Sequence, residues 1–249
     1  MRTDSENRHR GALTVPFLIL AALTVTGCAG AFEPPPPLWE PGRYSTIAVL
    51  PSRMEISTGA PFTSKNTELS DRYGALVQEA IAVAMVNKGY EVLAPMDSNE
   101  RIAEDDDLME AFMELAFGAG VAPPEAYRDR RYEGPLETAP VLGEALGADL
   151  IVLSAGEGEY HSAGEALVQG ILTSVLTKGK QQYQAPPSYL VTEVVFVDPE
   201  LERVVARLRT GRYDYVSDVP RAAGVFLRLF RRIPPGTRDR DAAPPPPPP

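Results

Sequence analysis

The chain has 249 residues, with 24 Lys or Arg, 34 Asp or Glu and two His, and its formal net charge is −10. This charge argues against nucleic acid as a partner, because binding to phosphates needs a basic surplus. A single Cys excludes a disulfide framework and every site built from several thiolates. Two His leave little for zinc or for acid–base catalysis.

The first 27 residues have the features of a secretory signal. Arginines outweigh acids at the start, and the apolar stretch 12–26 is shorter than the ~20 residues that a transmembrane helix needs. The stretch ends in Val25-Thr26-Gly27-Cys28, which resembles the lipobox of bacterial lipoproteins. The resemblance implies that residues 1–27 are removed and that Cys28 carries a diacylglycerol thioether and an N-terminal acyl chain, which together give a stable anchor. The alternative is an ordinary signal peptide with Cys28 at this position by chance.

The residue after Cys28 bears on location. By resemblance to the sorting rule of enteric lipoproteins, in which Asp at this position favours the inner membrane, Ala29 implies the outer membrane, with the domain facing the periplasm. Without residues 1–27 the formal charge becomes about −11, which repels an anionic lipid surface. We therefore expect the covalent lipid on Cys28 to hold the protein on the membrane, and we expect no other cofactor.

Composition divides the chain into four parts. The signal, 1–27, is followed by the lipidated Cys and a Pro-rich tether, 28–42. Residues 43–235 are enough for one domain with a substantial core. The tail, 236–249, ends in Pro244–Pro249, and we expect it to be disordered.

Apolar periodicity predicts alternating strands and helices between residues 43 and 235. A strand at 43–50 stops at Pro51, and a polar loop then reaches Asn66. A helix follows and ends near Lys88-Gly89. The later predicted elements are, in order, a strand at 90–93, a helix that starts at a capping box at 97–100, a loop at 118–135, a short helix at 141–146 closed by Gly147, a strand at 149–160, a helix at 167–176, strands at 189–197 and 204–209, and a last helix from near Asp218.

The order of these elements indicates the fold class. The continuous apolar run Leu150–Leu153 is typical of a strand that is buried on both faces. The last two strands are joined at Asp198-Pro199-Glu200 as a hairpin. The order βαβααβαββα therefore predicts an α/β (α+β) domain, in which helices pack against a mixed sheet of about five strands.

Three sequence blocks resemble a group of bacterial envelope lipoproteins. They are 46–51 (TIAVLP), 88–93 (KGYEVL) and 146–152 (LGADLIV), the last followed by a hairpin and an amphipathic helix. The domain of this group is similar to the amino-terminal domain of the Tol-system translocation protein, and relatives include the curli-secretion channel lipoprotein and penicillin-binding-protein activator lipoproteins. The group commonly turns its hairpin with Asp-x-x-x-Gly, whereas this chain has Glu202 at the position of that Gly. The resemblance implies a fold more than a role, and it implies no catalytic residues.

Candidate sites for chemistry are few. Gly156-Glu157-Gly158 follows a strand, but a dinucleotide fingerprint needs Gly where His161 stands. His161 and Ser162 are adjacent, and neighbours in an extended segment point to opposite sides. The four acids Glu104–Asp107 lack the alternation and the Gly of a calcium loop, and they are typical of a solvated helix junction. We therefore expect no catalytic, cofactor or metal site.

The segment 163–178 is the candidate docking surface. Glycines at 164, 170 and 179 weaken it as an isolated helix, so that it needs a surface to pack on. Three surfaces remain open: the protein's own sheet, a second chain or another protein, and the membrane. The apolar residues of this segment share one helical stripe and are Leu167, Val168, Ile171, Leu172, Val175 and Leu176.

These features predict a non-enzymatic, lipid-anchored envelope lipoprotein that acts as a protein-binding or assembly component of a cell-envelope complex. An oligomeric channel-forming or secretion component is the alternative. The expected partners are the membrane, through the acyl chains, and an envelope protein or a second copy. The cluster Arg128, Arg130 and Arg131 adds a cell-wall polymer as a further candidate, although it can instead pair with the acidic segment before it.

Overall fold

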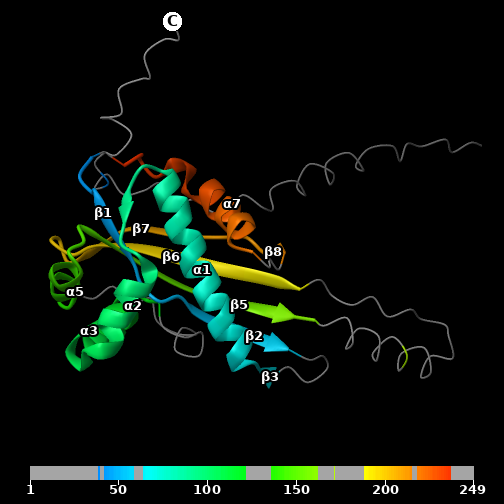
Figure 1. Cartoon of the computed structure of the whole chain (residues 1–249). Coiled ribbons are helices and arrows are strands. Elements are labelled where there is room, and N and C mark those ends of the chain that lie inside the picture. Colours follow the sequence, from blue (N-terminus) through cyan, green and yellow to red (C-terminus); the bar gives the residue numbers. More distant parts are fainter. Residues whose placement is uncertain are drawn as a thin grey trace, which may run out of the picture. The chain divides into compact units, whose positions relative to one another are not determined.

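The computed structural model describes residue 39 and residues 42–58, 64–121, 136–161, 171, 188–214 and 218–236. All of them belong to the unit Glu33–Pro249. Within these ranges no helix has both the length and the apolar character needed to cross a membrane. The predicted fold class is confirmed, because helices pack against one mixed sheet (Figure 1).

The central strand of the sheet is β5, which pairs with neighbours on both sides. On one side, β1 pairs in parallel with its first part and β2 in parallel with its second part, so that β1 and β2 follow one another along the same edge. On the other side β6 is antiparallel to β5 and pairs in turn with β7 and β8. Outside β1 and β2 lie β4 and β3. The strands are β1 Thr46–Val49, β2 Arg53–Thr58, β3 Ser64–Lys65, β4 Glu91–Val92, β5 Leu150–Tyr160, β6 Tyr189–Asp198, β7 Arg203–Arg209 and β8 Tyr213–Asp214.

The sheet differs from the prediction of about five strands because its outer rows are broken into shorter pieces. The described residues form eight strands. The strand β2 lies where the sequence predicted only a polar loop, and that prediction is wrong. In β2 the buried Met54 and Ile56 alternate with more exposed residues. This short segment is a strand because it pairs with β5, which lies about 100 positions further along the chain. The sequence of the six residues of β2 does not indicate that pairing partner.

Most helix boundaries agree with the predicted signals. The five α-helices among the described residues are α1 Thr67–Asn87, α2 Pro95–Glu104, α3 Asp106–Gly118, α5 Ala139–Leu146 and α7 Val219–Leu229, and the 3₁₀ helix η1 is Phe230–Arg232. Asn66 caps α1 by accepting a hydrogen bond from the backbone N–H of Leu69. Gly147 closes α5 with a φ of 69°, and Asp218 caps α7. The predicted helix start after the loop that reaches Asn66, the predicted closure at Gly147 and the predicted helix start near Asp218 are confirmed, whereas the capping hydrogen bonds of Asn66 and Asp218 are findings of the structure.

The predicted helix start at 97–100 is wrong. Helix α2 begins at Pro95, because Pro is well suited to the first helical position. It ends at Glu104, and the extended Asp105 then caps α3 by accepting hydrogen bonds from the backbone N–H groups of Asp107 and Leu108. The acidic run is therefore a helix junction, as predicted.

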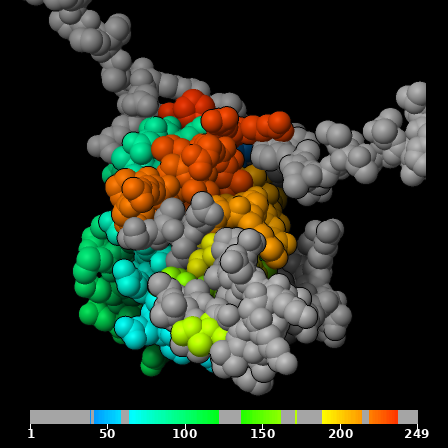
Figure 2. All heavy atoms as spheres, turned by 90° about the vertical axis from the view of Figure 1, so that its right-hand side faces the viewer, coloured from blue at the N-terminus to red at the C-terminus, as the bar shows by residue number. Residues whose placement is uncertain are grey.

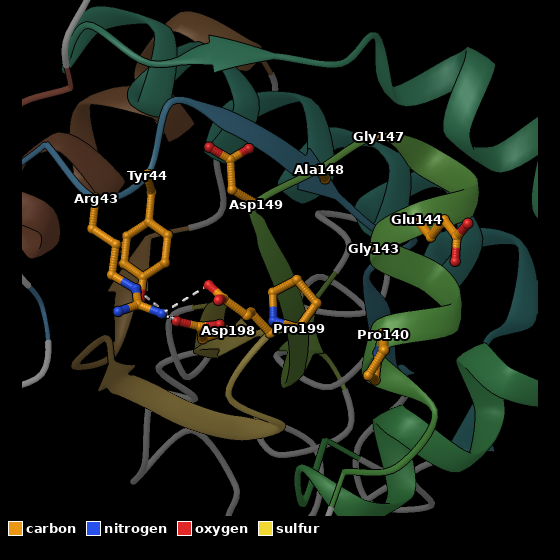
Figure 3. Close-up of a pocket in the computed structure, with 11 residues that line it drawn as sticks. Arg43, Tyr44, Pro140, Gly143, Glu144, Gly147, Ala148, Asp149, Asp198 and Pro199 are labelled. Atoms are coloured by element: carbon orange, nitrogen blue, oxygen red, sulfur yellow. Dashed lines mark hydrogen bonds and ion pairs between the residues drawn. The ribbon is translucent and has the colours of Figure 1, made fainter.

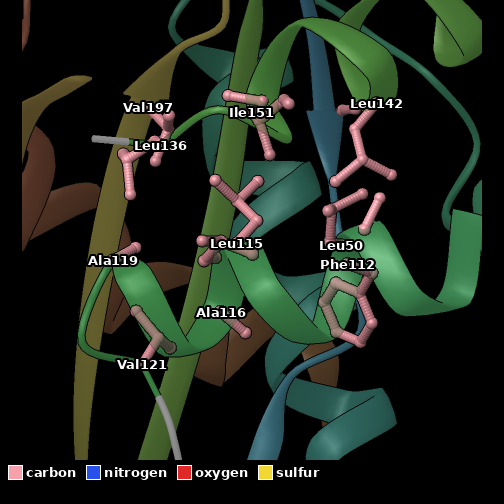
Figure 4. Packing of buried hydrophobic residues seen from close by; sticks show 14 of the residues in the cluster. Leu50, Phe112, Leu115, Ala116, Ala119, Val121, Leu136, Leu142, Ile151 and Val197 are labelled. Atoms are coloured by element: carbon pink, nitrogen blue, oxygen red, sulfur yellow. The ribbon is translucent and has the colours of Figure 1, made fainter. Parts of the chain in front are cut away.

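Each face of the sheet is covered by helices. On one face, side chains of β1, β5 and β6 pack against α2, α3 and α5, and this cluster includes Leu50, Leu115, Leu142, Ile151 and Val197 (Figure 4). On the other face α7 packs beside α1. There the Phe196 ring of β6 meets the Phe230 ring of η1 edge-on, with centroids 5.5 Å apart, and it meets the Trp39 ring at 5.1 Å. The sheet is thus the middle of three layers.

Candidate functional site

A shallow pocket of about 480 Å³ lies where α5, the β6–β7 turn and the residues before β1 meet (Figure 3). Its polar lining consists mainly of carboxylates. The lining residues are Arg43, Tyr44, Pro140, Gly143, Glu144, Gly147, Ala148, Asp149, Asp198, Pro199 and Glu200. None of these residues is a Ser, Thr, Cys, His or Lys.

The buried carboxylate of Asp198 is at the centre of the pocket's hydrogen bonds. Its Oδ2 accepts hydrogen bonds from the Tyr44 hydroxyl at 2.7 Å and from Arg43 Nε at 3.1 Å (Figure 3). Its Oδ1 accepts one from the backbone N–H of Leu201 at 2.9 Å. A carboxylate that is 1% exposed needs such donors, and here both of its oxygens have them.

Tyr44 is held in its protonated form. Burial raises the pKa of the Tyr44 hydroxyl above its usual range, and the hydrogen bond to Asp198 and the charge of that carboxylate raise this pKa further. The hydroxyl is therefore a hydrogen-bond donor over the physiological pH range and is no candidate for a general base.

A second carboxylate, that of Asp149, holds the beginning of β1. Its Oδ2 accepts hydrogen bonds from the backbone N–H and the hydroxyl of Ser45 at 2.8 and 2.7 Å. Arg43 Nη2 lies 3.2 Å from Glu200 Oε2 at the pocket rim. These contacts indicate that the pocket fastens the β6–β7 turn to the chain before β1. Asp198 and Glu200 pair with Arg43 and Asp149 accepts hydrogen bonds from Ser45. The Glu144 side chain forms neither an ion pair nor a hydrogen bond with another described residue.

The wall between α5 and the turn is tightly packed. A Cβ built on Gly143 would lie 2.6 Å from Pro199 Cβ, so that only Gly allows α5 to approach the turn this closely. The pocket wall is therefore a close contact between α5 and the β6–β7 turn, and this contact holds the two elements together.

Cys28 and all but one of the candidate docking residues lie outside the described residues. This applies to Leu167, Val168, Leu172, Val175 and Leu176, and also to the arginines at 128, 130 and 131. Ile171 is described, and its side chain is 56% exposed. The docking and lipidation hypotheses therefore stay predictions.

The Gly156-Glu157-Gly158 motif lies within β5 and serves sheet packing. A Cβ on Gly156 would lie 2.4 Å from the backbone oxygen of Val191, and one on Gly158 would lie 2.5 Å from that of Tyr189. Both glycines are paired with β2 and β6, whereas a dinucleotide loop would precede a helix. The close approach of β6 explains why Gly occupies both positions.

His161 follows β5 and lies beside a carboxylate. Its Nε2 is 3.8 Å from Glu159 Oε2, and its backbone N–H donates to the Ser188 hydroxyl at 3.0 Å. No group of three potential metal ligands occurs among the described residues.

The sequence analysis missed the exposed face of α3. Met109 and Met113 lie on this face and are 38% and 41% exposed, and Phe117, one turn further along, is 57% exposed. The four-residue spacing of these side chains was visible in the sequence. The apolar stripe of Leu108, Phe112 and Leu115 on the opposite side packs into the core, and a helix with apolar residues on two sides gives no sequence signal for which side is buried.

No protein-family model matches the chain, and no curated protein matches it. Three solved structures show partial likeness. The PelC dodecamer from Paraburkholderia phytofirmans is 9% identical with a TM-score of 0.35, over 78% of this chain and 91% of that chain. Lipoprotein GNA1162 from Neisseria meningitidis is 14% identical with a TM-score of 0.31, over 76% and 97%. The LpoB C-terminal domain from Salmonella enterica is 7% identical with a TM-score of 0.28, over 71% and 86%. These likenesses assign no function to this chain.

Proposed function

We propose that this protein is a lipid-anchored component of the bacterial cell envelope that acts by binding a protein partner and not by catalysis. The observation that carries the proposal is the sequence Val25-Thr26-Gly27-Cys28 after a charged start and an apolar stretch. The only Cys of the chain stands at the one position that a lipobox requires. By the same resemblance, Ala29 favours the outer membrane, with the domain in the periplasm.

The outer side of α3 supports a binding role. Met109 and Met113 expose apolar, adaptable side chains, and Glu110 and Glu114 lie next to them on the same exposed side of the helix. Methionine is over-represented in protein interfaces because its flexible thioether fits varied partner surfaces. In the pocket, by contrast, Asp149 and Asp198 are engaged by hydrogen bonds within the chain.

The anchor is tested by mass spectrometry of the protein purified from bacterial membranes. We expect an acylated N-terminal Cys28 and none of residues 1–27. A Cys28→Ser variant should leave the membrane fraction in a carbonate wash, since the proposal provides no other anchor. Retention of this variant on the membrane would contradict the lipid anchor.

The binding role is tested by crosslinking in the native envelope, followed by mass spectrometry of the captured proteins. We expect a crosslink to a defined protein through α3, and we expect Met113→Asp to abolish it while circular dichroism of the variant stays unchanged. A crosslink pattern that is unaffected by this change would contradict the role of α3.

A further inference from the structure

Two helical segments, one in each outer layer, carry opposite charges. Residues 95–118, which include α2 and α3, contain eight acidic residues and one basic residue, a formal charge of −7. Residues 219–232, which form α7 and η1, contain four arginines and no acidic residue, a formal charge of +4. In a chain with a net charge of −10, this basic segment is a strong local exception.

On α3 the acidic side chains form one continuous exposed strip. Asp106, Glu110 and Glu114 are four residues apart and therefore lie on one side of the helix. Met109 and Met113 run beside them, and Met113 is held in place by a contact of its sulfur with Arg53 Nη2 at 2.7 Å. We call these five residues the α3 outer face. None of its three carboxylates forms an ion pair with another described residue.

On α7 the arginines lie opposite the buried side of the helix. Ala222, Ala223 and Phe226 face the core. The exposed residues Arg221, Arg228 and Arg231 form what we call the α7 outer face. Figure 2 shows the orange and red atoms of this part of the chain on the surface of the molecule. Arg221 lies 3.5 Å from Asp218, whereas Arg228 and Arg231 form no ion pair with another described residue.

These two faces cannot meet within one copy, because the sheet separates α3 from α7 (Figure 1). Each copy therefore presents an acidic surface and a basic surface in different layers. From this charge complementarity we infer that the partner is a second copy of the chain, whose α7 outer face docks on the α3 outer face of the first. This inference rests on the proposed function, since it identifies the bound protein.

Such an interface joins two different surfaces and is therefore heterologous. Heterologous contacts repeat from copy to copy and give a closed ring or an open filament. Attraction between the faces also sets the orientation of docking, because like faces repel.

An anionic membrane is the rival partner for the α7 outer face. Membrane-surface helices combine basic residues with large apolar residues that enter the lipid. Among the described residues, α7 and η1 have no exposed large hydrophobic side chain that could enter the lipid. This feature favours a second copy.

The test uses the full chain in neutral detergent and sedimentation velocity. We expect the wild type to associate at low salt and to dissociate as salt rises, because the Debye length falls below about 10 Å above 0.1 M salt. Glu110→Lys/Glu114→Lys reverses one face, and Arg228→Glu/Arg231→Glu reverses the other. Each variant alone should associate at least about tenfold more weakly. The control Glu79→Lys/Glu91→Lys makes the same change in charge elsewhere on the exposed surface and should associate like the wild type.

Mixing the two reversed variants is the decisive measurement. The lysine face of one then matches the glutamate face of the other, so that the mixture should regain association, a result that misfolding cannot produce. A wild type that stays monomeric, or a mixture that stays apart, overturns the inference. Binding of each variant to phosphatidylglycerol vesicles is measured in parallel. If Arg228→Glu/Arg231→Glu weakens binding to these vesicles and leaves association between copies unchanged, the partner is a membrane and the inference also fails. In either case, a Cys28-dependent anchor and a captured different protein would leave the proposed function standing.

Discussion

The hydroxyl of Tyr44 donates a hydrogen bond to the carboxylate of Asp198 at 2.7 Å, although 154 positions separate the two residues. Tyr44 precedes β1, and Asp198 ends β6. Arg43 strengthens the same junction through its Nε at 3.1 Å from the carboxylate. The contact therefore ties the chain before β1 to the β6–β7 hairpin turn. Neither residue belongs to a sequence motif that would predict this contact.

Replacing Tyr44 should destabilise the fold. Tyr44→Phe removes one donor from a buried carboxylate, and we expect the free energy of unfolding to fall by about 1–3 kcal/mol in urea denaturation. The control Glu200→Gln removes a pair whose Glu side chain is 85% exposed, and it should change stability by less than about 1 kcal/mol. Equal losses in the two variants would mean that burial of Asp198 does not decide the strength of this contact.

Alkaline pH should unfold the protein through its buried tyrosines. Burial raises the pKa of Tyr90 to about 12, and burial also raises the pKa of Tyr213. In the unfolded chain Tyr ionises near pH 10, so that the unfolded state loses protons first and stability falls as pH rises above about 10. Urea denaturation between about pH 8 and pH 11 should show this fall, and Tyr90→Phe should make it shallower. A Tyr90→Phe protein with an unchanged slope would contradict this assignment.

The turn residue Glu202 should gain from replacement by Gly. Glu202 has a φ of 49°, in the left-handed region that costs residues with a Cβ about 1 kcal/mol. We expect Glu202→Gly to raise the free energy of unfolding by roughly 0.5–1 kcal/mol. Glu202→Ala removes the same carboxylate and keeps the Cβ, so it should show no gain. A gain in both variants would assign the effect to charge.

Two glycines should respond to Ala in opposite directions. In Gly156→Ala the new Cβ would lie 2.4 Å from the Val191 backbone oxygen, and we expect a loss of about 1–3 kcal/mol or more. A Cβ on Gly224, within α7, would meet no atom within 4 Å, and Gly224→Ala should stabilise the helix by up to about 1 kcal/mol. Thermal unfolding followed by circular dichroism distinguishes the two outcomes. A Gly156→Ala protein as stable as the wild type would show that β6 can move away from β5.

The cap of α3 should be sensitive to substitution, unlike the acids around it. Asp105→Ala leaves the N–H groups of Asp107 and Leu108 without their acceptor, at a cost of about 0.5–2 kcal/mol. The neighbouring Glu104→Gln should stay within about 0.5 kcal/mol of the wild type, because Glu104 is exposed and is not a cap. Urea denaturation compares the two, and similar losses would contradict the capping role.

Local signals in the sequence determined much of this fold. The α1 cap at Asn66, the left-handed Gly147 and the Asp218 cap depend on neighbours a few residues away, and each was predictable for that reason. The continuous apolar run in β5 likewise indicated a strand with both faces covered. Successive side chains of a strand point to opposite faces, and here the residues on both faces are buried. The lipobox hypothesis also depends on sequence alone, and it lies outside the described residues.

Tertiary structure decided what depends on partners far along the chain. The strand β2 exists because β5 lies beside it. Tyr44 and Asp198 meet because the start of β1 and the end of β6 both pair with the beginning of β5, so that the two residues lie at the same end of the sheet. The sequence showed acids in α3 and arginines in α7, but periodicity cannot tell which layer a helix joins. Only the packed sheet, by separating the two charged faces, leaves each of them available to another molecule.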